Sequence, residues 1–300
     1  MRVAITDSGV GGLSVCAALE AELVRRGLGD GLEVLYLNAA LEDDYAYNAM
    51  PTRFEQLHTF DAFLCGATET YNPDLLFIAC NTLSVMFEDP FFAGHDRFPI
   101  RGIVDTGVNE ILAALASDPT AGVAIFATPI TIGGNTYRDR LLAAGVAPER
   151  IVQQACPGLP DAISNDVSGA EAAALLDRFV PEALARFASR PEKVFAFLGC
   201  THFGYQAPLF RSRLVAEGEQ AVVIDPNIAA ADTLIDPIIE AGVGRGQASF
   251  EVVSRYTIPE RPLVSLARYL GDRAPATLAA LRDHTLRPDL FGRITQEERA

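Results

Sequence analysis

Two cysteines stand where an apolar run meets residues with hydrogen-bonding side chains. Cys80 ends the run that begins at Leu75 and is followed by Asn81–Thr82, and Cys200 ends a similar run and is followed by Thr201–His202. A free cysteine in an apolar run is commonly a small, inert core residue. A core residue does not require polar neighbours at the end of its strand, so this pattern favours two thiols that contact a bound molecule held by the residues after them.

The other cysteines and the histidines indicate neither disulfides nor a metal. The cysteines are five in number and widely spaced, so reduced thiols are expected. Cys16 and Cys65 fall in helical stretches and are interpreted as core residues, whereas Cys156, before Pro157, remains open between the core and the site. The four histidines show no metal-ligand spacing, so no metal site is predicted.

A pair of thiols suits proton transfer at a carbon centre. Racemisation removes a proton from one face of Cα and returns a proton to the other, which two opposed groups do more easily than one. Hydrogen-bond donors or positive charges lower a cysteine pKa from about 8.5 toward neutrality, and a base with a pKa near the working pH transfers protons well in both directions.

Three further polar groups are candidates for the same site. Asp7 and Ser8 follow the first apolar run, where the aspartate either caps a turn or pairs with a substrate ammonium or with Cys80. The glycines after them are not a dinucleotide fingerprint, because Ser14 occupies the third glycine position. His202, two residues after Cys200, is a candidate acid/base partner of that thiol. Thr128 and Thr131 either bind a carboxylate or cap the helix that follows them.

Alternating strand and helix patterns position these residues. We expect strands over Arg2–Thr6, Glu33–Leu37, Asp74–Ala79, Arg101–Val104, Gly122–Ala127, Arg150–Ala155, Lys193–Leu198, Ala221–Ile224 and Ser249–Tyr256. We expect helices over Gly12–Arg26, Pro51–Thr70, Thr106–Ala116, Gly134–Ala144, Ser168–Ala188 and Ala229–Ala241, with one or two short helices near the end. This alternation is typical of α/β proteins with parallel sheets.

An internal repeat organises these elements. Val3–Ile5 recurs as Val123–Ile125, and at the same offset of 120 residues Phe77–Thr82 matches Phe197–His202. We therefore predict two similar parallel-sheet α/β domains related by pseudo-symmetry, the first formed by residues 1–100 plus about 210–300 and the second by residues 101–209. Ligands of open α/β sheets bind outside the carboxyl ends of the strands, so the active site is expected in the interdomain cleft.

Composition excludes several classes of function. The formal net charge is −15, which disfavours a nucleic-acid partner. No apolar run approaches the length of a membrane span, and Met1 leads directly into a strand pattern without a signal-peptide layout, so a soluble cytoplasmic protein is expected. Lys193 is the only lysine and lies in a turn, which argues against pyridoxal phosphate, a cofactor that needs a Schiff-base lysine.

Taken together, these stretches resemble glutamate racemase, in the aspartate/glutamate racemase superfamily. The matching stretches are Asp7–Val15, Ala79–Thr82, Ala127–Thr131 with Tyr137, Ala155–Pro157 and Leu198–His202, in family order over about 200 residues. The resemblance implies two α/β domains, no cofactor, often a homodimer, and a small amino-acid substrate. It further implies catalytic thiols at Cys80 and Cys200, aided by Asp7 and His202, and binding of the amino acid by Ser8, Asn81, Thr82 and Thr201.

Two stretches depart from the family pattern. Glutamate racemases usually carry a Tyr-Gly pair whose backbone amides bind a substrate carboxylate; here Tyr47 and Asn48 stand in its place, close to Asp43. The family also carries an acidic residue several positions after its Ala-Cys-Pro. That residue is not clearly present here, and Asp161 is its nearest counterpart. An acidic residue near Tyr47 and Asn48 would repel a substrate carboxylate, so glutamate as the substrate is less well supported than chemistry at Cα.

The most favoured function is racemisation of L-glutamate to D-glutamate for cell-wall precursors. A sister racemase acting on aspartate or another α-substituted acid remains an alternative. A non-catalytic small-molecule binding protein or a cysteine hydrolase would leave at least one of the two matched thiols unexplained, and both cysteines are present, which disfavours a single-thiol decarboxylase.

Overall fold

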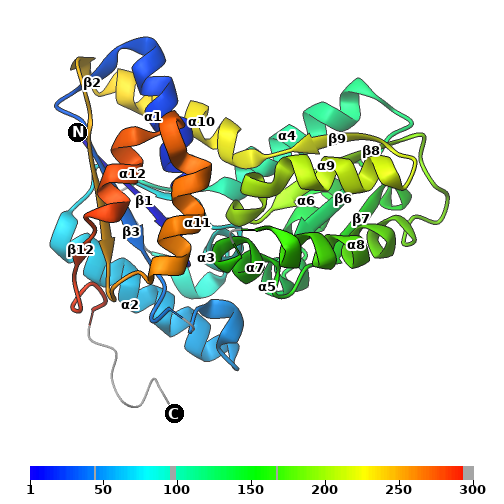
Figure 1. Cartoon of the computed structure of the whole chain (residues 1–300), viewed down its shortest axis with the longest axis horizontal. Coiled ribbons are helices and arrows are strands. Elements are labelled where there is room, and N and C mark those ends of the chain that lie inside the picture. The colour runs from blue at the N-terminus through cyan, green and yellow to red at the C-terminus, as the bar shows by residue number, and fades with distance from the viewer. Residues whose placement is uncertain (44, 95–98, 167, 293–300) are drawn as a thin grey trace.

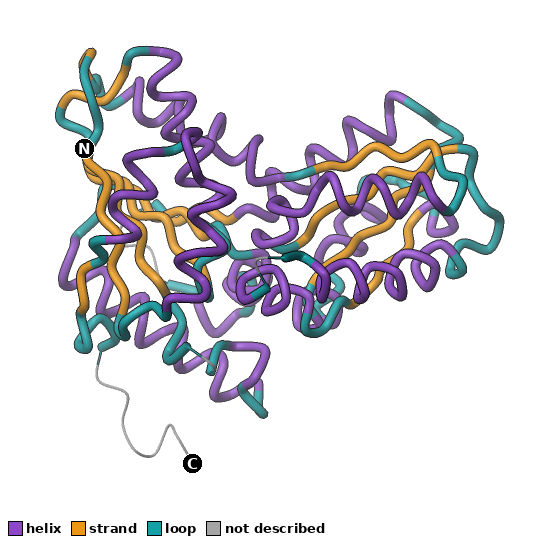
Figure 2. The backbone as a smooth tube through the Cα atoms, in the orientation of Figure 1, coloured by secondary structure: helices purple, strands orange, loops and turns teal. Residues whose placement is uncertain are grey.

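The computed structural model describes residues 1–300 except 44, 95–98, 167 and 293–300. It contains two parallel sheets with helices on both faces of each, arranged as two α/β units side by side (Figures 1 and 2). The strands read as nearly continuous apolar runs because parallel sheets are covered on both faces. The predicted α/β class with two parallel-sheet units is confirmed.

The first sheet contains both early and late segments of the chain. In spatial order its strands are β12 (Thr285–Leu286), β11 (Ser249–Ser254), β3 (Glu33–Asn38), β1 (Arg2–Asp7), β4 (Leu75–Ile78) and β5 (Ile100–Gly102). All of its pairings are parallel. The chain therefore returns to this sheet after leaving it at Gly102, and β11 lies against β3 on the side opposite β1.

The second sheet repeats the order of the first. Its strands are β7 (Ile151–Ala155), β6 (Gly122–Ala127), β8 (Lys193–Gly199) and β9 (Gln220–Ile224), all parallel. The order β7-β6-β8-β9 matches β3-β1-β4-β5, and the predicted repeat falls on equivalent strands, β1 with β6 and β4 with β8. The two units are thus pseudo-symmetric. The domain limits stay a prediction, and the pairing of β9 with β8 favours a return to the first unit after Ile224.

Helices cover both sheets. They are α1 (Leu13–Arg26), α2 (Arg53–Tyr71), α3 (Asn81–Phe87), α4 (Ile103–Ser117), α5 (Pro129–Gly133), α6 (Thr136–Ala143), α7 (Leu159–Asn165), α8 (Ala170–Leu184), α9 (Ala207–Ala216), α10 (Pro226–Glu240), α11 (Glu260–Leu270) and α12 (Pro275–Arg282). Helices α1, α10, α11 and α12 contribute to the core on one face of the first sheet, and α2 and α3 to the core on the other. Helices α7, α8 and α9 contribute to one core of the second sheet, and α4 and α6 to the other.

Smaller elements complete the described chain. They are β2 (Leu28–Asp30) and β10 (Gly244–Arg245), which pair antiparallel, and the 3-10 turns η1 (Tyr47–Ala49), η2 (Pro90–Phe92), η3 (Pro148–Arg150), η4 (Thr201–Gln206) and η5 (Gly271–Arg273). Within the described ranges, no helix is both long enough and apolar enough to cross a bilayer.

One expected strand is partly helical. The sequence predicts a strand over Arg101–Val104, but β5 ends at Gly102 and Ile103 begins α4. Gly102 adopts the extended N-cap conformation, and the backbone N–H of Val104 donates to Ser84 Oγ at 3.5 Å. A side chain at Gly102 would also meet that Oγ at 2.0 Å. The close approach of α3 therefore ends the strand early.

Candidate active site

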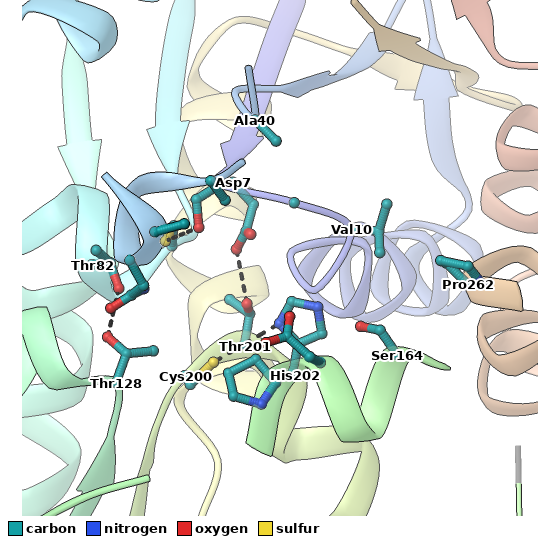
Figure 3. A pocket seen from close by; sticks show the side chains of 18 of the residues that line it. Asp7, Val10, Ala40, Thr82, Thr128, Ser164, Cys200, Thr201, His202 and Pro262 are labelled. Carbon is teal, nitrogen blue, oxygen red and sulfur yellow. Dashed lines mark hydrogen bonds between the residues drawn. The ribbon is translucent and has the colours of Figure 1, made fainter. Parts of the chain in front are cut away.

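The predicted site residues gather at the carboxyl ends of the two sheets. A cavity of about 480 Å³ lies there, and Figure 3 shows side chains that line it, with Asp7 and Thr201 joined by a hydrogen bond. Ten of the twelve predicted residues line this cavity: Asp7, Ser8, Asn48, Cys80, Asn81, Thr82, Thr128, Cys200, Thr201 and His202. Both thiols therefore border one shared space, each from a different sheet.

Cys80 lies where β4 passes into α3. It is the N-cap of that helix, and its Sγ accepts from the backbone N–H of Leu83 at 3.5 Å. Ser8 Oγ, from the end of the neighbouring strand β1, lies 3.1 Å from the same sulfur. Burial, together with the negative charge of Asp7, raises the thiol pKa to about 12. Without a bound ligand, Cys80 is therefore a protonated thiol that hydrogen-bonds at the edge of the cavity.

Cys200 occupies the equivalent position in the second unit. It follows β8 and precedes η4. Its Sγ lies 3.9 Å from Nδ1 of His202. Burial first, and then Asp7 and Cys80, raise the Cys200 pKa well above its ordinary value, whereas burial lowers the pKa of His202 to about 4. Near pH 7 the imidazole is therefore neutral, with one ring nitrogen able to accept a proton.

Asp7 ends the central strand of the first sheet and is almost completely buried. Thr201 Oγ1 donates to its Oδ2 at 2.8 Å, and Oδ1 has no hydrogen-bond partner among the described residues. Burial raises the carboxyl pKa to about 7, while the hydrogen bonds from Thr201 and from the backbone N–H of Gly9 counteract that rise. A carboxyl that titrates near neutrality suits an acid/base role or an ammonium partner.

Hydroxyl groups from both units meet on another wall of the cavity. Thr82 Oγ1 lies 2.8 Å from Thr128 Oγ1 and 3.2 Å from Thr131 Oγ1, and the two latter oxygens are 3.0 Å apart. Thr128 also caps α5 by accepting from the backbone N–H of Thr131. Thr128 thus both caps a helix and borders the cavity, so the two interpretations of this residue are compatible.

Asn81 presents a buried donor beside the first thiol. Tyr137 O–H donates to Asn81 Oδ1 at 2.5 Å, which fixes the orientation of the amide. Asn81 Nδ2 is buried and has no hydrogen-bond partner among the described residues. An unpaired buried N–H costs free energy, and a substrate carboxylate would satisfy it.

Two of the predicted substrate-binding residues do not line the cavity. Tyr47 is fully buried in the core under the first sheet, where its ring packs edge-on against Phe60 at a centroid distance of 6.0 Å. Thr131 contacts Thr82 and Thr128 from behind and is itself buried. Neither side chain therefore borders the cavity: the Tyr47 ring packs in the core, and Thr131 contacts the two threonines that do. Binding of the substrate by Thr131, or by the backbone amide of Tyr47, stays a prediction.

Several lining residues lie outside the predicted set. They are Gly9, Val10, Ala40, Asp43, Ala46, Ala49, Pro129, Cys156, Pro157, Gly158, Pro160, Asp161, Ser164, Asn165, Tyr256, Ile258 and Pro262. Cys156 joins the site because its backbone N–H pairs with Ala127 O at 2.8 Å, beside the end of β6. Tyr256, Ile258 and Pro262 come from the C-terminal segment, which has no motif to mark them.

The charge of the lining is one-sided. Asp7, Asp43 and Asp161 contribute carboxyl groups, and the described lining contains neither lysine nor arginine. Burial and the nearby Asp43 both raise the pKa of Asp161. Because no lysine or arginine lines the described cavity, a substrate carboxylate must be held by neutral donors.

Within the part of the chain that the structure describes, no group of three or more His, Cys, Asp or Glu side chains is arranged to hold a metal ion.

Comparisons with known proteins identify the relationship. No family model matches the chain. The glutamate racemase of Streptococcus sanguinis is 28% identical over 214 residues, covering 71% of this chain and 73% of that protein. The glutamate racemase of Aquifex aeolicus is 27% identical over 244 residues, covering 81% and 86%. The chain is a homologue of the glutamate racemases. These relatives are amino-acid racemases, a class of isomerase, and the chain is similar to them along most of its length.

A solved glutamate racemase has the same fold. The crystal structure of the Francisella tularensis enzyme in complex with D-glutamate matches with a TM-score of 0.68 at 20% identity, covering 90% of this chain and 93% of that one. The likeness covers 90% of this chain and so extends beyond the roughly 200 residues that contain the predicted motifs. The expected resemblance to glutamate racemase is thereby confirmed.

Proposed function

We propose that this glutamate racemase homologue interconverts L- and D-glutamate without a cofactor, using Cys80 and Cys200 as opposed acid/base groups. The observation that supports this most directly is that both thiols border a single cavity from different sheets. Each thiol has a candidate proton partner. The negative charge of Asp7 acts on Cys80 and raises its pKa, and His202 lies beside Cys200.

The proposed reaction moves two protons and exchanges the protonation states of the two cysteines. One cysteine, as thiolate, removes the Cα proton, and the other, as thiol, donates its proton to the opposite face. The first then holds a proton and the second is a thiolate, so the next turnover runs in reverse on the other enantiomer. Because burial keeps both thiols protonated in the free site, one of them must lose its proton when the substrate's ammonium group enters. Asp7 and His202 are the proposed acceptors.

The substrate backbone would be held by neutral donors. Asn81 Nδ2, Thr82 Oγ1 and Thr201 lie at the ends of the two cysteine-bearing strands, where an α-carboxylate would satisfy the unpaired amide. Donors placed on this carboxylate would also stabilise the negative charge that develops when Cα loses its proton. The ammonium group would donate a hydrogen bond to Oδ1 of Asp7, which is unpartnered among the described residues and can accept whether the carboxyl is charged or protonated.

Glutamate is favoured as the substrate by the homologues. The Francisella tularensis relative is solved with D-glutamate. D-glutamate for cell-wall precursors, a cytoplasmic location and a homodimer are parts of the same proposal. Sedimentation of the purified chain tests the dimer directly. Aspartate or another α-substituted acid is the alternative substrate. The carboxyl groups of Asp43 and Asp161 border the same cavity and would repel any side-chain carboxylate, which favours an α-substituted acid without one.

Exchange at Cα tests the reaction. The purified protein is incubated with single-enantiomer amino acids in heavy water, and optical rotation and deuterium at Cα are followed together. Exchange with inversion supports the proposal, and the best substrate distinguishes glutamate from its alternatives. Binding without exchange would favour a non-catalytic binding protein.

Cysteine variants test the mechanism. Cys80→Ser and Cys200→Ser should each lower the racemisation rate by about 100-fold or more. A serine hydroxyl is a far weaker acid than a thiol, and it is not ionised near neutral pH and so cannot act as the base. Cys65→Ser is the matched control, because Cys65 lies outside the cavity and is exposed, not in the core as the sequence pattern predicts. A Cys80 or Cys200 variant with full activity would remove that thiol from the mechanism.

A further inference from the structure

Tyr256 reaches the site from the far end of the sequence. It lies two residues after β11, which pairs in parallel with β3, and the end of β3 pairs in turn with the end of β1 at Asp7. Its side chain therefore lies at the same sheet edge as Asp7, and it lines the cavity that contains both thiols. Neither the sequence motifs nor the proposed mechanism assigns it a role.

The orientation of Asn38 determines what the Tyr256 hydroxyl can do. The backbone N–H of Ala40 donates to Asn38 Oδ1 at 3.0 Å. Because a peptide N–H can only donate, the amide oxygen must face Ala40, and the amide nitrogen must face the other way. Nδ2 then donates to Ser254 Oγ at 3.2 Å and to Tyr256 Oη at 3.3 Å.

The Tyr256 oxygen is thus an acceptor for Asn38, and its own hydrogen is left to donate elsewhere. Among the described residues, the structure records no acceptor for that hydrogen. Burial and the negative charge of Asp43 raise the Tyr256 pKa to about 12, so the hydroxyl keeps its hydrogen at any working pH. The cavity therefore has a neutral donor fixed on its wall.

We propose that Tyr256 is a specificity-determining residue whose hydroxyl donates a hydrogen bond to an acceptor at the end of the substrate side chain. This inference rests on the proposed function, and the acceptor in that case is the γ-carboxylate of glutamate. A neutral donor suits this role because the described lining has no lysine or arginine to neutralise a side-chain carboxylate.

The spacing of the strands agrees with this assignment. Cys80 follows β4 and Tyr256 follows β11, and the sheet order β11-β3-β1-β4 places three strand spacings between them. Neighbouring strands lie about 4.8 Å apart, so the two strand ends are separated by about 14 Å. The cysteine and tyrosine side chains shorten this span, and a substrate side chain that extends from Cα toward β11 would bridge the remainder. A short side chain such as that of alanine would leave the hydroxyl without a partner.

Removing the hydroxyl while keeping the ring tests the proposal. Tyr256→Phe should raise the KM for glutamate about 10-fold or more, as expected for the loss of a hydrogen bond to a charged group, and should change kcat much less. The KM for alanine, which has no side-chain acceptor, should not change. Tyr71→Phe is the matched control, because Tyr71 belongs to α2 and does not line the cavity.

A second variant turns the hydroxyl away without removing it. In Asn38→Asp, one carboxylate oxygen would still accept from Ala40, and the other would accept the Tyr256 hydrogen. We expect a similar rise in the glutamate KM, with no further rise in the double variant. If melting curves show that Asn38→Asp does not fold, Tyr256→Phe and its control decide the question alone.

The outcomes separate this proposal from the proposed function. An unchanged glutamate KM in Tyr256→Phe, with racemisation intact, overturns the role of Tyr256 and leaves the reaction standing. If the wild-type protein binds glutamate without exchanging its α-proton, the reaction falls, and the calorimetric Kd of the same variants decides the role of Tyr256. If it neither binds nor exchanges glutamate, both proposals fall.

Discussion

Thr201 Oγ1 donates a 2.8 Å hydrogen bond to Asp7 Oδ2, and this bond joins the residue after the second thiol to the central strand of the other unit. The bond favours the charged form of Asp7 and so holds its pKa lower than burial alone would set it. The two halves of the site are therefore coupled through one hydroxyl group. Several consequences can be measured.

The first prediction concerns pH dependence. Thr201→Val removes the donor, destabilises the Asp7 carboxylate and raises its pKa further above about 7. If Asp7 acts as a base, the acid limb of the kcat/KM profile should move to higher pH by about 0.5 to 1 unit. Thr201→Ser, which keeps the hydroxyl, should leave the limb in place. A limb that stays fixed in Thr201→Val would exclude Asp7 as the group that titrates there.

The second prediction concerns stability. The Asp7 pKa is about 7 in the folded protein, against 3.8 for the free side chain. Between these values the folded state binds a proton that the unfolded state lacks, so the free energy of unfolding falls as pH rises from about 4 to 7 and is then constant. Asp7→Asn has no carboxyl to titrate, so this fall in the free energy of unfolding is removed. It should unfold with a free energy about 1 to 3 kcal/mol higher than the wild type at pH 8.

Urea titrations at pH 5 and pH 8 test this second prediction. The stability gain of Asp7→Asn over the wild type should be larger at pH 8 than at pH 5, because the buried carboxylate is charged only at the higher pH. The same variant should lose racemase activity. A gain that is equal at both pH values would mean that charge burial at Asp7 is not its source.

The third prediction concerns a close approach between the units. A Cβ added to Gly11 would lie 2.4 Å from both Thr201 Oγ1 and His202 Nδ1. Gly11→Ala should therefore displace these two side chains and lower kcat/KM by about 10-fold or more, as misplaced catalytic groups do. Gly133→Ala is the control, since a side chain there meets nothing within 4 Å. Equal activities in the two variants would contradict the prediction.

The fourth prediction concerns the acidic residues of the cavity. Asp43 and Asp161 both face the space into which glutamate would bring a second carboxylate. Asp43→Asn and Asp161→Asn should each lower the KM for glutamate by about 2- to 5-fold, because one repulsive charge is removed. The effect should shrink at high ionic strength, which screens exposed charges. A KM that rises in both variants would show that these carboxyl groups bind the substrate instead.

The sequence predicts the first sheet, the second sheet and the thiols because each depends on local patterns. Apolar runs mark the strands, and the shared 120-residue offset marks the repeated order. Tyr256 could not be found in this way. Its place in the site depends on the pairing of β11 with β3 and on a hydrogen bond to Asn38 between residues 218 positions apart. No local motif records such a contact.

Local sequence patterns also do not predict very short helices or which loop side chains are buried. Helix α3 has seven residues and begins directly after its N-cap Cys80, so its pattern is too short to separate from the strand before it. Tyr47 follows the family motif in position, yet its ring packs against Phe60 in the core. Whether a side chain in a loop faces a cavity or a core depends on the packing of distant helices, which a single sequence does not specify.

The repeated sheet order bears on how such a catalyst arose. A single unit with one strand-end thiol could flank a carbon centre on both faces only by pairing with an identical copy, and each thiol would then have had the same neighbours. Two copies joined in one chain are free to diverge. Ser8 accompanies Cys80 and His202 accompanies Cys200, so the two thiols of this chain have chemically unlike neighbours. The kcat values for the two enantiomers can consequently differ, with the KM values differing in the same ratio, because enantiomers have equal free energy and kcat/KM must be the same in both directions.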